Sequence, residues 1–247
     1  MPTAAAALDS PVVTFVGDVH GWSDRLDRVL AQSEGLLVFL GDLIDRGPDS
    51  PGVLDRVHAL CAAGTACGVL GNHEYALIRG LGVPELDISA QPGMFAAWAQ
   101  RYGGAAVLAA YGVGESQPEA LRDRLGGHLP WLASLPWLLS GGTDAGRWLA
   151  VHAGLSEEPL GPQLDELRDP RRWWSDPDAE LPPALYHKPR AFQVPCDLPR
   201  DTCVVSGHTP LPRVHRTPGR ILCDTSGGQP GRPLSAVVWP EGRVISG

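Results

Sequence analysis

Five short polar clusters in this sequence each begin where an apolar segment stops. They are Gly17-Asp18-Val19-His20-Gly21, Gly41-Asp42-Leu43-Ile44-Asp45-Arg46-Gly47, Gly71-Asn72-His73-Glu74, Val151-His152-Ala153-Gly154 and Gly207-His208-Thr209-Pro210. Asp, Asn and neutral His offer oxygen and nitrogen ligands, a mixture that suits Mn, Fe, Zn or Co better than Ca. A carboxylate has two oxygens and can bridge two ions. The clusters therefore predict a site for two divalent transition-metal ions.

Such a pair of ions points to phosphoester hydrolysis. Two ions about 3.5–4 Å apart can clamp a phosphoryl group and ionise a shared water near neutral pH. That hydroxide can attack phosphorus directly, and a His beside a carboxylate can protonate the leaving oxygen. One such dipeptide is weak evidence, because a lone His is more often structural. Five clusters together favour the metal site over a purely structural reading.

Apolar, β-branched runs precede the first three clusters and predict the strands that deliver them. Strands are expected at 11–16, 36–40 and 65–70. They are separated by two helices, of which the first can be capped by Ser23 and the second starts at Ser50, followed by Pro51. Alternating strands and helices with short links are typical of a parallel sheet in an α/β fold. Ligands of such sheets gather beyond the carboxyl ends of the strands, where these clusters lie.

The second half of the sequence is rich in predicted strands. They are expected at 147–151, 202–206, 221–224, 234–239 and 244–245. The last two follow a hairpin signal at Pro240-Glu241-Gly242, whereas 156–185 is expected to be mostly loop. We expect a second sheet packed on the first, with helices outside. Residues 9–247 are expected to form a single domain, in which the segment at about 82–142 is inserted and covers part of the site.

Composition and charge exclude several classes of protein. A net charge of −8 argues against binding to a nucleic-acid backbone, although a metal centre supplies its own local positive charge. Five cysteines without a Cys-x-x-Cys pair favour free thiols in a reducing compartment. No apolar run reaches transmembrane length, and Met1–Ser10 lacks the features of a signal peptide. We therefore expect a cytoplasmic protein without membrane contact, and the sequence leaves its oligomeric state open.

The five clusters, in this order over positions 17 to 210, resemble the motifs of the calcineurin-like metallophosphoesterases. More narrowly, they resemble the phosphoprotein phosphatase branch, with its bacterial and phage serine/threonine phosphatases and its diadenosine tetraphosphatases. The tail at 223–228 and 234–239 also resembles bacterial members. The resemblance implies a four-layer α/β/β/α fold, a two-sheet β-sandwich flanked by helices, and one metallophosphoesterase domain over 9–247.

The resemblance also implies roles for individual residues. The expected metal ligands are Asp18 and His20 on the first ion, Asp42 bridging both ions, and Asn72, His152 and His208 on the second. His73 is expected to act as the general acid, oriented by Asp45. Arg46 and Asn72 are expected to contact phosphate oxygens. Mn is the expected metal, with Fe, Zn or Co as alternatives.

The substrate and one contact stay open. The family's second phosphate-binding arginine has two candidates here, Arg172 and Arg190. Ala153 makes the fourth motif His-Ala-Gly, which is frequent among diadenosine-polyphosphate hydrolases. Trp173 and Trp174 can stack on a base or peptide, but adjacent aromatic residues more often anchor a loop. We expect a phosphomonoesterase acting on phosphoserine or phosphothreonine in protein or on small phosphoesters. A dinucleoside polyphosphate hydrolase is the alternative, and a non-catalytic binding module a third hypothesis.

Overall fold

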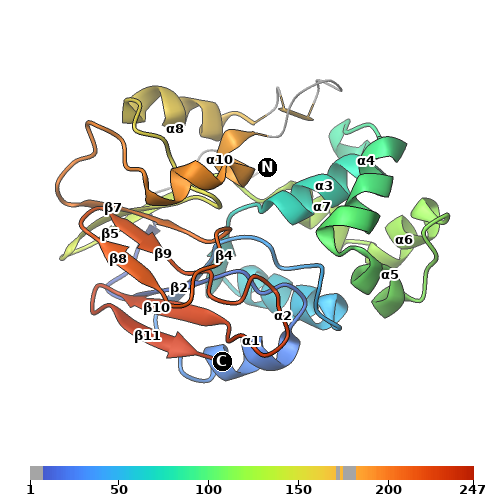
Figure 1. The fold of residues 1–247 in the computed structure, drawn as a ribbon, viewed down its shortest axis with the longest axis horizontal. Helices are drawn as coiled ribbons and strands as arrows, with labels where there is room; N and C mark the ends of the chain where they lie inside the picture. The colour runs from blue at the N-terminus through green and yellow to red at the C-terminus, as the bar shows by residue number, and fades with distance from the viewer. Residues whose placement is uncertain (1–7, 171–172, 175–181) are drawn as a thin grey trace.

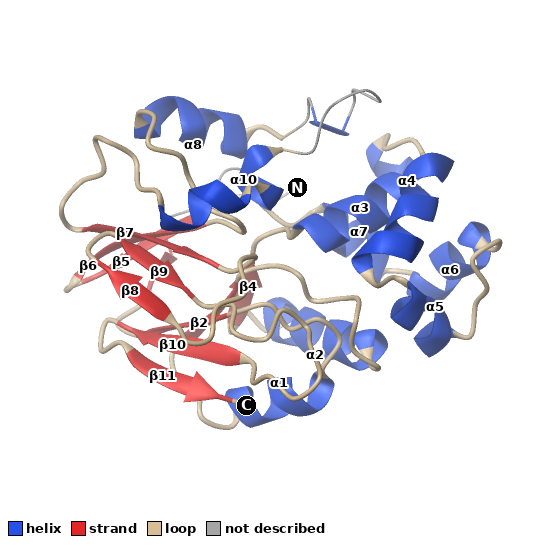
Figure 2. Cartoon of the chain, in the orientation of Figure 1, coloured by secondary structure: helices blue, strands red, loops and turns tan. Residues whose placement is uncertain are grey.

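The structure is a computed structural model, and it describes residues 8–170, 173–174 and 182–247. Two β-sheets lie face to face, with helices on both outer sides (Figure 1, Figure 2). One sheet has six strands in the order β1-β5-β6-β7-β9-β8, and the other has five in the order β11-β10-β2-β3-β4. The predicted two-sheet sandwich flanked by helices is therefore confirmed.

The five-stranded sheet carries the first three polar clusters at one edge. Its strands are β2 (Val13–Val16), β3 (Leu36–Phe39), β4 (Ala66–Gly68), β10 (Ser235–Trp239) and β11 (Arg243–Ser246). β2, β3 and β4 are parallel, and Val16, Phe39 and Gly68 are in register at their carboxyl ends. The helices α1 (Ser23–Leu30) and α2 (Ser50–Ala62) connect them. The three following loops consequently emerge side by side.

The six-stranded sheet places the other two clusters next to each other. Its strands are β1 (Leu8–Asp9), β5 (Leu139–Thr143), β6 (Gly146–Ala150), β7 (Thr202–Ser206), β8 (His215–Thr217) and β9 (Arg220–Leu222). β6 and β7 are parallel, with Ala150 opposite Val205, so the loops carrying His152 and His208 leave the sheet as neighbours. The sequence did not predict β1, β5 or β8.

Short helices of the described residues lie between β6 and β7 in the chain. They are α8 (Leu160–Arg168), α10 (Pro183–Tyr186) and η3 (Lys188–Phe192). The expectation that 156–185 is mostly loop was wrong for α8. Its apolar residues Leu160, Leu164 and Leu167 recur at helical spacing, and Pro162 lies in the first turn, where proline is tolerated.

The segment at 82–142 folds mainly into helices that gather at one end of the sandwich (Figure 1). They are η1 (Pro84–Leu86), α4 (Pro92–Ala97), the π-helical turn η2 (Trp98–Tyr102), α5 (Ala105–Tyr111), α6 (Pro118–Leu125) and α7 (His128–Ala133), next to α3 (Asn72–Leu81). Trp98, Leu121 and Leu132 share a hydrophobic cluster with Val16 of β2. The segment is thus packed onto the sandwich, and β5 begins inside its predicted range.

The space between the two sheets is filled by inward-facing residues of both. Val13, Phe15, Val38, Trp148 and Val237 belong to this buried cluster. The Phe15 and Trp148 rings meet edge to face, with centroids 5.3 Å apart. Large aromatic side chains buried across both sheets hold them in one relative position.

The helix start expected at Ser50 is confirmed, whereas the cap expected at Ser23 was wrong. α1 is preceded by Trp22 and has no side-chain cap. α2 is capped by Asp49, whose carboxylate accepts the N–H of Gly52 at 2.9 Å. The Ser50 hydroxyl instead accepts the N–H of Asp45 at 3.2 Å, because it faces the polar loop that precedes the helix. Among the described residues, no helix is long and apolar enough to cross a membrane.

Candidate metal centre and active site

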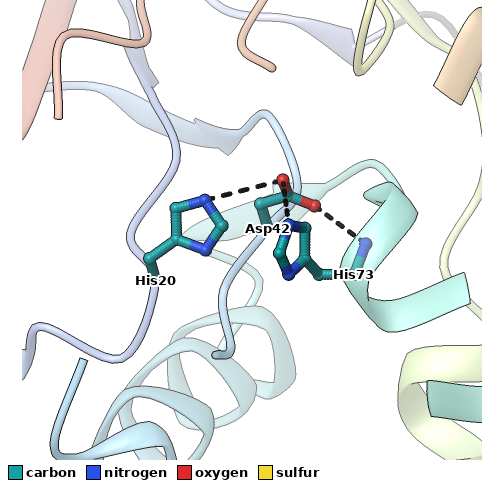
Figure 3. A group of neighbouring side chains, drawn as sticks. All are labelled: His20, Asp42 and His73. Carbon is teal, nitrogen blue, oxygen red and sulfur yellow. Dashed lines mark hydrogen bonds and ion pairs between the residues drawn. The ribbon is translucent and has the colours of Figure 1, made fainter. Parts of the chain in front are cut away.

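Asp42 belongs to two groups of metal-ligand side chains, one of which is drawn in Figure 3. One group joins it to His20 and His73, and the other joins it to His152 and His208; within each group the ligand atoms lie within 4.8 Å of one another. Asp42 Oδ2 is 3.7 Å from Nε2 of both His20 and His73, and Oδ1 is 3.3 Å from Nε2 of His152. The carboxylate therefore faces both groups, as a bridging ligand must.

The backbone at these positions adopts conformations that ordinary residues rarely take. His20, Asp42 and His208 have φ of 48°, 51° and 64°. A non-glycine residue in the left-handed region costs of order 1–3 kcal/mol and persists where the surroundings impose it. Strained residues of this kind are concentrated at functional sites. Here the strained turns direct the three side chains toward one another.

Asn72 joins the second group from the start of α3. Its Oδ1 lies 2.9 Å from His152 Nε2 and 2.9 Å from His208 Nδ1. The other nitrogen of His152, Nδ1, lies 2.7 Å from the carbonyl oxygen of Leu40. A contact of this kind fixes the imidazole and turns Nε2 toward the centre. The structure thus brings Asn72, His152 and His208 together around one side of Asp42.

Asp18 is buried in the same place, but its contacts differ from those of the other predicted ligands. Its carboxylate accepts the backbone N–H of His208 at 2.9 and 3.1 Å. Burial, and then the charges of Asp224 and Asp42, raise the pKa of Asp18 well above its usual value. His73, rather than Asp18, is within ligand distance of His20 and Asp42. The sequence did not predict that His73 would lie so near the first group.

The donor set fits divalent cations. Asp18, Asp42 and Asp224 are at most 2% exposed, so their charges repel one another in a poorly solvated place. Asp224 Oδ2 has no hydrogen-bond partner within the described part of the chain. Buried carboxylates are normally paired with cations or coordinate metals. The neighbouring imidazoles are neutral nitrogen ligands, which complete a site for a transition-metal ion.

His73 is held by Asp45 and by the inserted segment. His73 Nδ1 lies 2.6 Å from Asp45 Oδ2, and the indole N–H of Trp98 donates to the same oxygen at 3.0 Å. The Tyr102 ring packs edge-on against His73, with centroids 5.1 Å apart. Burial lowers the pKa of His73 and raises that of Asp45. Trp98 and Tyr102 therefore belong to the site, and no sequence spacing had indicated them.

Arg46 is an exposed residue that contacts two buried imidazoles of the site. Its Nη1 donates to His20 Nε2 at 2.7 Å and to the Gly227 carbonyl at 2.9 Å, and its Nη2 donates to His73 Nε2 at 2.9 Å. Arg46 is exposed, whereas the two imidazoles are buried. An exposed guanidinium beside a buried ligand cluster is well placed to bind a phosphate group.

Glu74 is a further residue of the site, and no role was predicted for it from the sequence. Its carboxylate accepts the backbone N–H groups of Asp42 at 2.9 Å, Leu43 at 2.8 Å, Ile44 at 3.2 Å and Gly71 at 3.1 Å. Four N–H groups on one buried carboxylate hold the loop after β3 against the start of α3. Its position in the first turn of a predicted helix was the only signal, because acidic residues are favoured there.

Two arginines and two tryptophans were also considered from the sequence. Arg172 falls outside the described residues. Arg190 lies in η3, where burial lowers its pKa and the charge of Glu166 raises it. Trp173 stacks on Trp137 at 6.3 Å, and Trp174 packs on Tyr75 at 4.8 Å. Both tryptophans thus contact core aromatic residues, as expected for a loop anchor.

Comparison with known proteins identifies the family. A family model for the calcineurin-like phosphoesterases matches residues 11–233. The chain belongs to this family. Over 65 residues, the phosphoesterase is 45% identical to the symmetrical bis(5'-nucleosyl)-tetraphosphatase of Ralstonia nicotianae. The match covers 26% of this chain and 23% of that protein. Over 67 residues, it is also 45% identical to serine/threonine-protein phosphatase 1 of Salmonella typhimurium. This match covers 25% of this chain and 29% of that protein.

These matches span about a quarter of each curated relative. Across the whole phosphoesterase, the fold resembles that of a cold-active protein-tyrosine phosphatase from a Shewanella species. The TM-score is 0.58 at 20% identity, over 100% of this chain and 80% of that one. At this identity the likeness shows a shared fold.

Proposed function

We propose that this phosphoesterase is a metal-dependent hydrolase of phosphomonoesters, foremost of phosphoserine and phosphothreonine in protein. The observation that supports this most is Asp42, which faces two groups of ligand atoms while the His73–Asp45 pair lies beside it. Asp18 and His20 are proposed to hold one ion, and Asn72, His152 and His208 the other, with Asp42 between them. Mn is the proposed metal.

The residues of the chain have distinct tasks in the proposed reaction. Bound divalent ions would polarise the phosphoryl group and make a water nucleophilic near neutral pH. Arg46, together with Asn72, would bind phosphate oxygens and orient the ester. His73 Nε2 faces the site, since Nδ1 is held by Asp45, so Nε2 is the atom that would protonate the leaving oxygen. Asp45 would orient the ring and, when ionised, would oppose the lowering of the His73 pKa that burial causes.

The proposal also includes the domain organisation, the cellular compartment and the partner of the protein. Residues 9–247 would form one domain whose inserted segment, through Trp98 and Tyr102, closes one side of the site. The five cysteines are all free, which supports a reducing compartment such as the cytoplasm. The partner would be a phosphorylated protein or a small phosphoester.

Hydrolysis of dinucleoside polyphosphates is the second candidate. The Ralstonia nicotianae relative is a symmetrical bis(5'-nucleosyl)-tetraphosphatase, and its identity over the matched residues equals that of the Salmonella typhimurium phosphatase. The same ligands and the same His73 would serve, because the reaction again breaks a P–O bond. The two candidates differ in what the inserted segment must accommodate.

One assay separates the candidates. Purified, Mn-loaded protein is given a phosphoserine peptide and, in parallel, diadenosine tetraphosphate, and kcat/KM is measured for each. We expect the phosphopeptide to be preferred; preference for the dinucleotide would favour the second candidate. Asp42→Asn, which keeps the shape of the side chain, serves as the control. Full activity in this variant, or none in the wild type on either substrate, would refute the proposal.

A further inference from the structure

A buried arginine behind the ligand loops has no task in the reaction proposed above. Arg220 opens β9 beside β7, and it is 1% exposed. Each of its five N–H groups has an acceptor. Nε donates to Ala191 O at 2.8 Å, Nη1 to Val204 O at 3.0 Å and Ile221 O at 3.2 Å, and Nη2 to Ser206 Oγ at 2.6 Å and Ala153 O at 3.4 Å. All five acceptors are neutral oxygens.

Burying this cation is unfavourable in itself. Burial lowers the pKa of Arg220 to about 10, partly offset by the thiols of Cys203 and Cys223, so the group is still charged at neutral pH. A well-packed apolar side chain is often as stable as a buried charge or more so. We therefore looked for the role of Arg220 in the segments that its N–H groups connect.

Two of the acceptors flank proposed metal ligands. Ala153 directly follows His152, and Ser206 precedes His208 by two residues. The single nitrogen Nη2 therefore links the loop that carries His152 to the last residue of β7, from which the loop with His208 leaves. The N–H of Gly207 donates to the His152 carbonyl at 2.9 Å and makes a second link between the same loops. These contacts, on the side of the loops away from the imidazoles, hold the two loops in a fixed relative position.

Gly154 shows independently that the loop is built around the guanidinium. Its φ is +131°, and a Cβ at this position would lie 2.7 Å from Arg220 Nη2 and 2.7 Å from the Arg190 carbonyl oxygen. Both the conformation and the space exclude a side chain. The third residue of the His-Ala-Gly motif consequently leaves room for Arg220.

We propose that Arg220 is a positioning residue for the second metal site, where it sets the separation of His152 and His208. The inference rests on the proposed function, in which these two imidazoles hold the second ion. The first site draws on His20, in the loop after β2, which lies in the other sheet. Loss of Arg220 should therefore weaken one of the two sites selectively.

The test is a metal titration of Arg220→Lys. Lysine keeps the charge, but one ammonium cannot replace a fork whose nitrogens reach both loops and Ala191. Metal-free protein is titrated with Mn²⁺ by calorimetry, and EPR detects the spin-coupled ion pair. We expect the first ion to bind as in the wild type and the second about 10–100-fold more weakly, as for other residues that orient metal ligands. The coupled signal should return at high Mn²⁺.

Arg79→Lys is the matched control. Arg79 is also buried, at 2% exposure, and donates to the Trp173 carbonyl at 2.7 Å, away from the two ligand loops. This variant should bind both ions as the wild type does. Unchanged second-site affinity in folded Arg220→Lys, or equal weakening of both sites, would overturn the inference.

A second variant covers a failure to fold. Ser206→Ala removes only one acceptor, and the second ion should then bind several-fold more weakly; unchanged affinity would overturn the inference. The wild-type titration tests the proposed function separately. If the wild type binds fewer than two ions, the proposed function fails and the inference falls with it. If the wild type binds two ions and the variants do not differ from it, only the inference fails.

Discussion

Replacing His73 with Asn tests the proposed general acid. His73 is 2% exposed and its Nδ1 is held by Asp45, so only Nε2 can meet the leaving oxygen. General acid catalysis contributes about 10²–10⁴-fold, or about 3–5 kcal/mol of barrier. The nearest alternative donor is Arg46, whose guanidinium does not give up its proton. We therefore expect kcat on a phosphoserine peptide to fall about 10³-fold.

The dependence on the leaving group makes this prediction specific. An alkoxide needs a proton as it leaves, whereas p-nitrophenolate is a stable anion, so kcat on p-nitrophenyl phosphate should fall about tenfold or less. Mn²⁺ stoichiometry, measured on the same samples, should remain that of the wild type. His128→Asn, on α7, serves as the control and should change neither rate. Equal losses on both esters, or the loss of one ion in His73→Asn, would refute the acid role and favour His73 as a ligand.

Three further outcomes follow from other contacts of the site. Glu74→Gln replaces a carboxylate that accepts four N–H groups with an amide, which has only one acceptor oxygen. The substitution should lower the free energy of unfolding, measured by urea denaturation, by about 1–3 kcal/mol. Trp98→Phe removes the N–H bonded to Asp45 and should lower kcat about three- to tenfold. Trp137→Phe, whose indole N–H has no hydrogen-bond partner within the described residues, should not change kcat. Chelation should lower Tm, because an ion at 100 times its Kd stabilises the fold by about 2.7 kcal/mol; an unchanged Tm would contradict bound metal.

The parallel part of the fold was predictable because its strands are continuous apolar runs. β2 and β3 are buried on both faces, so their sequences show a clear signal. β5 has no such signal, since Ser140, Gly141 and Gly142 lie at its centre. A Cβ on Gly141 would collide with the Leu8 carbonyl and the Trp148 ring. The strand therefore depends on close approach of neighbours, which a local pattern cannot reveal.

The ligand types were predictable for a related reason. Strand ends in register bring His20, Asp42 and Asn72 to one edge, and short loops leave little freedom. The residues that hold them were not predictable. Trp98 meets Asp45 across 53 positions, and Arg220 meets Ala153 across 67. Such contacts are decided by packing between segments and carry no characteristic spacing.

Anomalous diffraction from a Mn-soaked crystal tests the central claim most directly. We expect two peaks about 3.5–4 Å apart, one on each side of Asp42. One should lie against His20, and the other against Asn72, His152 and His208. No peak beside these residues, or a single peak that does not contact Asp42, would contradict the account.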